Sequence, residues 1–146
     1  MTTKNSGFSL IELMVVVAIL GILTTVGVIS YGSYTKGAKK TSAKNIMQQI
    51  SLGQIEYLSS FGFNYYTNAP LGDECEPDAA SSAAINDNLF GGGDMITDET
   101  GYEMCIEAGA TGGFVIKGTN GLSVEPTNIT LDSSGVWNTL TAWVSN

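Results

Sequence analysis

An apolar run near the start of the chain sets the strongest limit on what this sequence can fold into. From residue 8 to residue 29, the only charged side chain is that of Glu12. As a helix rising about 1.5 Å per residue, this run would be roughly 33 Å long, enough to cross a hydrocarbon core of about 30 Å. The sequence therefore predicts a membrane-spanning helix.

Glu12 is the residue that such a helix must accommodate. A charge inside a membrane span costs about 2.5–3.5 kcal/mol on insertion scales, so an ionisable group there indicates a functional role. The run contains no Lys, Arg or His to neutralise it. If the chain were cut between Gly7 and Phe8, a neighbouring copy displaced along the helix axis could bring its new α-amine to Glu12. Glu12 is then a candidate for fixing the stagger between identical packed helices.

The stretch Gly-Phe-Ser-Leu-Ile-Glu, residues 7–12, together with the apolar run, resembles the processing site of type IV pilins and the related pseudopilins. The resemblance implies that residues 1–7 are a leader, that a prepilin peptidase cleaves after Gly7, and that Phe8 is N-methylated. An ordinary secretory signal or single-span anchor is the alternative. A secretory signal needs small residues at a cleavage site after its apolar region, and Gly-Ile-Leu-Thr-Thr-Val is a poor one.

The resemblance further implies a structural filament subunit. The residues themselves suggest no enzyme, since the chain has no His to act as a general base and no acid pair stands out, and we expect no catalytic residues, metal or cofactor. A type IV pilin is held in the bacterial inner membrane. It then polymerises, with other pilins and an inner-membrane assembly machinery, into an extracellular pilus for adhesion, motility or DNA uptake. Two alternatives stay open. One is a pseudopilin of a type II secretion system, and the other is a membrane-tethered periplasmic binding domain that does not polymerise.

Charge is distributed unevenly along the chain. Since Glu12 is the one early acid, 13 of the 14 acidic residues lie at or after Glu56, where Lys117 is the one basic residue. An acidic C-terminal part argues against a specific nucleic-acid interface. Four lysines follow the apolar run, at positions 36, 39, 40 and 44. Contact with anionic headgroups and contact with acidic faces of adjacent subunits are both compatible with this pattern.

Apolar spacing predicts that the helix continues beyond the membrane. Apolar residues recur at three- and four-residue steps between residues 43 and 61, which is typical of an amphipathic helix. The other side is assigned to polar residues, namely Gln48, Gln49, Ser51, Gln54 and Glu56. Glycines at 21, 27, 32 and 37 should make the preceding part the softest. Ile29 stands where the pilin family often has a proline.

The expected organisation has four parts: a leader (1–7), a transmembrane and filament-core helix (8–31), its amphipathic continuation (32–60) and a globular part (61–146). The globular part is expected to contain a loop region (61–101) followed by an antiparallel sheet (102–146). The acidic clusters at 73–78 and 94–99 are interpreted as solvated loops, since neither has the spacing of a calcium-binding loop.

Alternation and turn residues predict the strands of that sheet. Alternating segments occur at 102–107, 114–117 and 122–125, and a hairpin is expected from strands 128–131 and 136–138 around the turn 132–135. The fold class is therefore α+β, with a long N-terminal helix packed against a small antiparallel sheet, as in the pilin fold.

Two cysteines, Cys75 and Cys105, lie in the globular part. In an exported chain an even pair indicates a disulfide, with two free buried thiols as the alternative. Many pilins have the second cysteine near the C-terminus, whereas here a long stretch of chain follows Cys105. Receptor-binding roles of the usual terminal loop are therefore not transferred to this chain.

Overall fold

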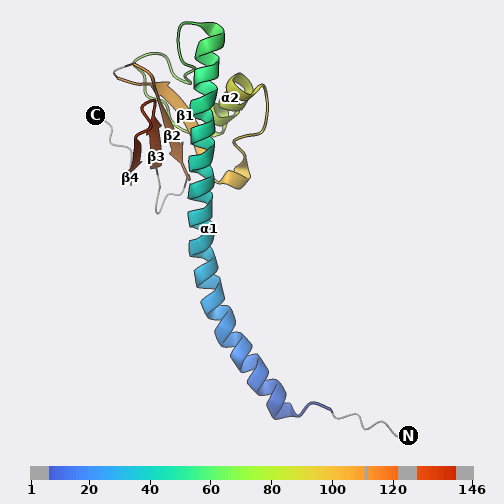
Figure 1. Cartoon of the computed structure of the whole chain (residues 1–146). Helices are drawn as coiled ribbons and strands as arrows, with labels where there is room; N and C mark the ends of the chain where they lie inside the picture. The colour runs from blue at the N-terminus through green and yellow to red at the C-terminus, as the bar shows by residue number, and fades with distance from the viewer. Residues whose placement is uncertain (1–6, 111, 122–127, 141–146) are drawn as a thin grey trace. The chain divides into compact units, whose positions relative to one another are not determined.

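The computed structural model describes residues 7–110, 112–121 and 128–140. The chain forms two compact units, residues 1–38 and residues 39–146. One long helix, α1 (Leu10–Phe61), begins in the first unit and ends in the second (Figure 1). In the first unit, every residue of α1 from 10 to 34 is exposed.

The second unit, residues 39–146, is called the head from here on. Its further elements are α2 (Ala79–Phe90), the 3-10 helix η1 (Asp98–Thr100), β1 (Glu103–Ala108), β2 (Phe114–Thr119), β3 (Asn128–Asp132) and β4 (Trp137–Leu140). The strands form an antiparallel sheet in the order β1-β2-β3-β4. A long N-terminal helix with a small antiparallel sheet confirms the predicted α+β class.

The observed strands match most of the strand predictions. The alternating segments 102–107 and 114–117 lie largely in β1 and β2, and the predicted hairpin is formed by β3 and β4. Its turn is held by Asp132, whose carboxylate accepts hydrogen bonds from the backbone N–H groups of Ser134 and Val136, each at 2.9 Å. The predicted strand 122–125 lies outside the described residues.

Register gives the sheet two chemically different faces. Ile106, Ile116 and Leu131 lie opposite one another along one row, and Cys105, Lys117 and Thr130 along the next. Because successive residues of a strand point to opposite faces, the first row belongs to the apolar face. That face is buried, with Ile106 and Ile116 fully inaccessible to solvent.

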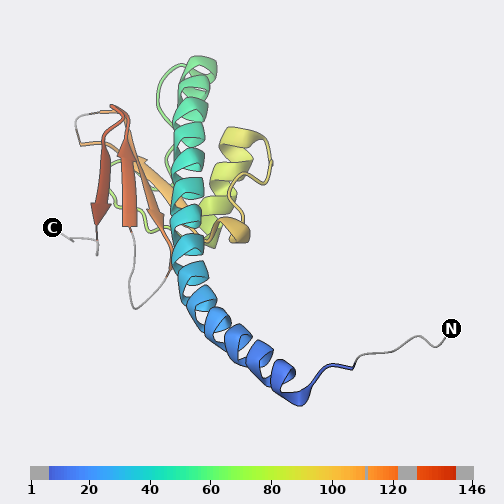
Figure 2. The same cartoon turned by 60° about the horizontal axis from the view of Figure 1, so that its bottom comes forward.

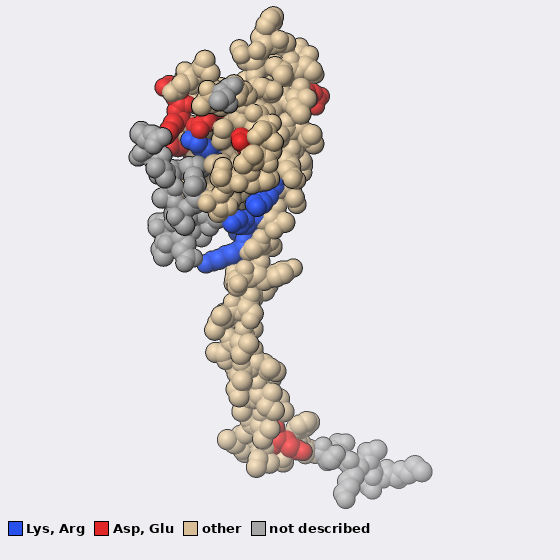
Figure 3. Space-filling model, turned by 60° about the vertical axis from the view of Figure 1, so that its left-hand side comes forward, with Lys and Arg blue, Asp and Glu red and all other residues tan. Residues whose placement is uncertain are grey.

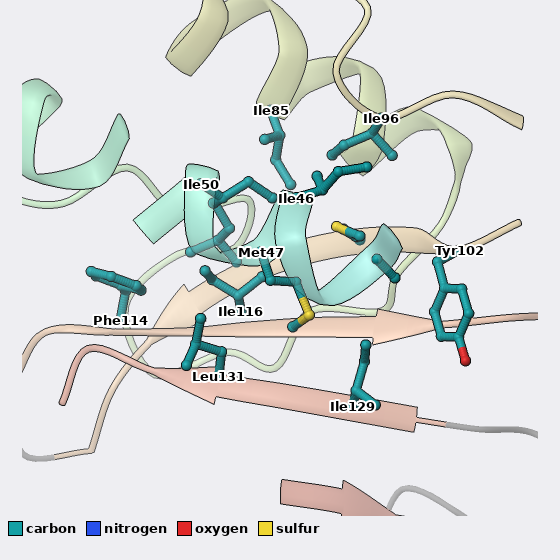
Figure 4. Packing of buried hydrophobic residues seen from close by; sticks show 13 residues of the cluster. Ile46, Met47, Ile50, Ile85, Ile96, Tyr102, Phe114, Ile116, Ile129 and Leu131 are labelled. Carbon is teal, nitrogen blue, oxygen red and sulfur yellow. The ribbon is translucent and has the colours of Figure 1, made fainter. Parts of the chain in front are cut away.

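The core of the head lies between the sheet and the second part of α1. Figure 4 shows Ile46, Met47 and Ile50 of α1 packed with Ile116 and Leu131 of the sheet. Their spacing along the helix places them on one face, as the periodicity predicted. On the other side of this part of α1 lies α2, as Figures 1 and 2 both show.

The predicted polar side of α1 is wrong at Gln54. This side chain is completely buried, whereas Ile55 and Phe61, assigned to the apolar stripe, are 58% and 66% exposed. Gln54 lies inside because its amide binds the backbone of the returning chain at Tyr66. A polar group can be buried when hydrogen bonds replace those it made to water.

The expected loop region 61–101 contains a helix that the sequence analysis missed. The carboxylate of Asp78 accepts a 2.6 Å hydrogen bond from the N–H of Ser81, and the Ser81 hydroxyl accepts one of 2.9 Å from the N–H of Asp78. This reciprocal capping box starts α2, and Gly91 ends it in the left-handed conformation at φ 62°. Gly91 is the first of three successive glycines, and its role is that of a helix cap.

Side chains from this region also occupy the outer edge of β1. Asn68 both donates its N–H to the carbonyl of Ile106 and accepts the N–H of Ile106 on its side-chain oxygen, each at 2.8 Å. The hydroxyl of Ser82 accepts the N–H of Met104 at 2.9 Å. These bonds satisfy backbone groups that an edge strand would otherwise leave open to another chain.

Candidate functional site

The predicted processing site lies just before the start of α1. Gly7 and Phe8 precede the first helical residue, and the Phe8 side chain is 83% exposed. A Cβ added at Gly7 would meet no atom within 4 Å. Exposed chain outside regular structure is where proteolysis concentrates, so the local geometry leaves the peptide bond after Gly7 open to a peptidase.

Glu12 has a hydrogen-bond partner within its own chain. Its Oε2 accepts the backbone N–H of Ser9 at 2.8 Å, and the Oγ of Ser9 accepts the backbone N–H of Glu12 at 3.3 Å. The carbonyl of Ser9 accepts the N–H of Leu13 at 3.3 Å, the first turn of the helix. Together these bonds form a capping box.

The apolar run offers no cation beside Glu12, and its partner is instead this neutral donor, which was not predicted. The signal was available, since Ser-x-x-Glu directly before an apolar run is the capping-box pattern. The first N–H groups of a helix have no partner inside it, and hydrocarbon offers none. The capping box therefore gives partners to two backbone donors, the N–H groups of Ser9 and Glu12, which would otherwise be unpaired in a bilayer.

The other polar side chains of the apolar run are also satisfied locally. The hydroxyl of Thr24 donates to the carbonyl of Leu20 at 2.9 Å, and that of Thr25 to the carbonyl of Gly21 at 2.7 Å. Among the described residues, α1 is the helix that is long and apolar enough to cross a membrane, with a mean hydropathy of 2.6 in its most apolar window. Figure 3 shows the apolar run at the start of this helix as uncharged surface, apart from an acidic group near its beginning.

A protein-family model described as the prokaryotic N-terminal methylation motif matches residues 2–28. This match spans Gly7, Phe8, the Ser9–Glu12 capping box and most of the apolar run. The chain therefore carries this N-terminal methylation motif.

Part of the chain is also similar to individual type IV pilins. The chain is 35% identical over 85 residues to the type IV major pilin protein PilE of Neisseria gonorrhoeae, covering 58% of this chain and 47% of that protein. It is 36% identical over 56 residues to the type IV major pilin protein PilA of Myxococcus xanthus, covering 38% and 26%. It is 39% identical over 62 residues to a fimbrial protein of Neisseria meningitidis serogroup B, covering 42% and 36%.

The chain thus spans less than half the length of these pilins. Their names are those of pilus proteins and not of enzymes. No solved structure matches the chain.

The two cysteines of the head are joined. Cys75 and Cys105 form a disulfide that ties the loop before α2 to the middle of β1, which confirms the predicted pair and excludes the free thiols. Both residues are buried. The acidic cluster at 73–78 is thereby fixed to the sheet, and its last member, Asp78, caps α2.

An ion pair lies beside this disulfide. The Nζ of Lys117 is 2.7 Å from Oε2 of Glu107, and the same carboxylate oxygen accepts the backbone N–H of Cys75 at 3.2 Å. The two charged side chains are only 11% and 16% exposed. Lys117, the one basic residue at or after Glu56, thus has a structural partner in the head.

Two of the four lysines after the apolar run have contacts in the head. The ammonium of Lys44 lies 5.0 Å from the ring centre of Trp137, a cation–π contact between α1 and β4. The side chain of Lys39 runs close to Gly101, the cap of η1, where an added Cβ would lie 2.9 Å from its Nζ. Part of this basic cluster therefore seats the helix against its own head.

Proposed function

We propose that this chain is a structural subunit of a type IV pilus. It is made as a membrane-anchored precursor, cleaved after Gly7 by a prepilin peptidase, N-methylated at Phe8 and polymerised through the segment 8–31. The observation that carries this proposal is the match of residues 2–28 to the N-terminal methylation motif. That match includes both the cleavage position and most of the segment that would polymerise.

The unpartnered apolar segment supports polymerisation. Large apolar side chains such as Leu10, Val16 and Ile29 are 76%, 45% and 77% exposed. Exposing such an apolar surface to water costs about 25 cal/mol of free energy for each Å². A bilayer covers it in the precursor, and the same helices of other copies cover it in a filament. Moving from lipid to a bundle keeps the surface out of water throughout.

Glu12 fixes the stagger between copies in this proposal. Cleavage after Gly7 turns the backbone nitrogen of Phe8 into an amine, which stays cationic after methylation. The amine of one copy approaches the Glu12 carboxylate of a neighbour displaced along the helix axis. Because the pair lies in an apolar bundle, an unpaired Glu12 would be strongly unfavourable. Any stagger of the helices that leaves Glu12 without an amine is therefore disfavoured.

The proposal also assigns location and partners. The precursor lies in the bacterial inner membrane, where the peptidase and the assembly machinery act on it. The finished subunit lies in an extracellular pilus with other copies or other pilins, with its acidic head on the outside. The names of its relatives favour a pilus over a type II secretion pseudopilus.

Shearing cells that express the full chain, then imaging the released material with an antibody against the head, tests this function. A pilus subunit is expected in long extracellular filaments. A tethered binding domain would instead stay in the membrane fraction and be absent from sheared material. Glu12→Ala should leave leader removal intact and greatly reduce filaments, whereas filaments at the wild-type level would refute the stagger role of Glu12.

A further inference from the structure

The capping box leaves Glu12 with one engaged and one available carboxylate oxygen. Oε2 accepts the N–H of Ser9 at 2.8 Å. Oε1 has no hydrogen-bond partner among the residues that the structure describes. The Oγ of Ser9 completes the box by accepting the N–H of Glu12 at 3.3 Å, so the first turn fixes both the backbone and the side chain of Glu12.

This arrangement survives the proposed cleavage. The N–H of Ser9 belongs to the peptide bond between Phe8 and Ser9, which removal of residues 1–7 leaves intact. The new amine is on Phe8, one residue before the capping box. The Glu12 carboxylate and the Phe8 amine thus lie at the same helix end. The hydrogen bond from Ser9 to Glu12 does not use this amine, which stays available for a neighbouring copy.

We infer that Ser9 is a positioning residue: its hydroxyl fixes the N–H of Glu12 and so keeps the Ser9 N–H on Oε2, which leaves Oε1 to meet the Phe8 amine of the neighbouring copy. This inference rests on the proposed filament function and adds a residue to it. A glutamate has several rotatable bonds and in a bilayer would turn toward the headgroups. With one oxygen held by Ser9, Glu12 is already arranged for the neighbour before the two copies meet.

The test measures how well variant subunits enter wild-type filaments. Each tagged full-length variant is expressed beside the untagged wild-type chain, and the ratio of tagged subunit in filaments to processed subunit in the membrane is quantified. Counting only processed subunit separates assembly from leader removal. Ser9→Ala should lower the ratio about fivefold, which is the change in an equilibrium that corresponds to the usual stabilisation by an N-cap hydroxyl. Ser9→Thr keeps the hydroxyl and should restore it.

Thr25→Ala is the matched control, because it removes a hydroxyl from the same segment that binds only carbonyls of the preceding turn. The ratio should stay at the wild-type value. An unchanged ratio in Ser9→Ala, or an equal fall in Thr25→Ala, would overturn the inference.

A double-variant comparison separates positioning from ordinary helix capping. Gln at position 12 can still accept the N–H of Ser9 but cannot form an ion pair with the amine. If Ser9 acts through Glu12, Ser9→Ala has little further effect in the Glu12→Gln background. An equal fold-loss in both backgrounds would show that Ser9 only caps the helix, which contradicts the inference.

A second measurement does not depend on filament yield. Solid-state NMR on the processed subunit in lipid bilayers reports the distance between a ¹⁵N label in Ser9 and a ¹³C label in the Glu12 carboxylate. One short distance is expected in the wild type and a broad distribution in Ser9→Ala. A single short distance in both refutes positioning by the hydroxyl. Wild-type cells without filaments would instead refute the proposed function, and the inference with it.

Discussion

The side-chain amide of Gln54 binds the backbone of Tyr66 in both directions. Its nitrogen donates to the Tyr66 carbonyl at 2.7 Å, and its oxygen accepts the Tyr66 N–H at 2.8 Å. Gln54 lies in the last turns of α1, and Tyr66 lies in the chain that returns toward the sheet. This pair therefore fixes how the chain leaves the helix and enters the head.

Gln54→Ala should destabilise the head strongly. The substitution leaves the N–H and carbonyl of Tyr66 without their partner and opens a cavity, which together lower the free energy of unfolding by about 2–4 kcal/mol. Chemical denaturation of the full chain in detergent micelles measures this change. Gln49→Ala, an exposed position on the same helix, should change it little. Equal effects at both positions would contradict the role assigned to Gln54.

Gly53→Ala should stabilise the head. The added Cβ would lie 3.6 Å from the nearest atoms of Leu89 and Phe90, an ordinary contact distance. Alanine is better than glycine inside a helix by about 0.5–1 kcal/mol. The melting temperature of the full chain in micelles should rise by a few degrees, whereas Gly53→Leu should lower it because no room remains for a large side chain. A fall in Gly53→Ala would mean that α1 and α2 pack more closely than described.

Breaking the disulfide should destabilise the head more than any surface change. Opening a loop with a sequence separation of 30 residues costs about 3–4 kcal/mol in the chain-entropy model. The double variant Cys75→Ser, Cys105→Ser should melt well below the wild type, and reductant should lower the wild type toward it. The double variant itself should not respond to reductant. A wild type that melts at the same temperature with and without reductant would contradict this account.

Acid should weaken the head partly through Asp78. Hydrogen bonds from the backbone and side chain of Ser81 lower the pKa of this carboxyl below its ordinary value of 3.8. Since its pKa is lower in the folded state, the stabilisation is complete above about pH 4 and is lost as pH falls through the folded pKa. Asp78→Asn, which still caps a helix, should therefore match the wild type near neutral pH and lose less stability between about pH 4 and pH 2.

The helical circular-dichroism signal of the full chain, recorded during an acid titration, checks this prediction. Asp87→Asn, on an exposed position of the same helix, makes the same change in charge and is the control. An acid profile of Asp78→Asn identical to that of the wild type would show that the cap contributes nothing to acid sensitivity.

Periodicity and turn chemistry predicted the parts of the fold that repeat a simple pattern. The apolar run predicted the first part of α1, and the spacing from Ala43 to Ile50 predicted the face that packs on the sheet. Alternation predicted β1 and β2, and the turn 132–135 predicted the hairpin. In each case burial selects apolar residues at regular intervals, so the sequence alone carries the information.

Hydrogen bonds between side chains and backbone were harder to predict, because one polar residue can replace water with a partner far away in sequence. Gln54 was assigned to the polar side because periodicity carries no information about the N–H and carbonyl of Tyr66, which bind its side chain. The helix α2 and the Ser9–Glu12 pair were missed for another reason. Both start with a polar residue whose partner lies three positions later, and that spacing was not examined as a helix signal.

The central claim is that residues 1–7 are removed and that Phe8 becomes the methylated first residue of a subunit polymerised by its apolar helix. Intact mass spectrometry of sheared extracellular filaments tests it most directly. The account predicts the mass of residues 8–146 with one added methyl group and two hydrogens missing for the Cys75–Cys105 disulfide. Filaments built from a chain that still carries residues 1–7 would contradict it.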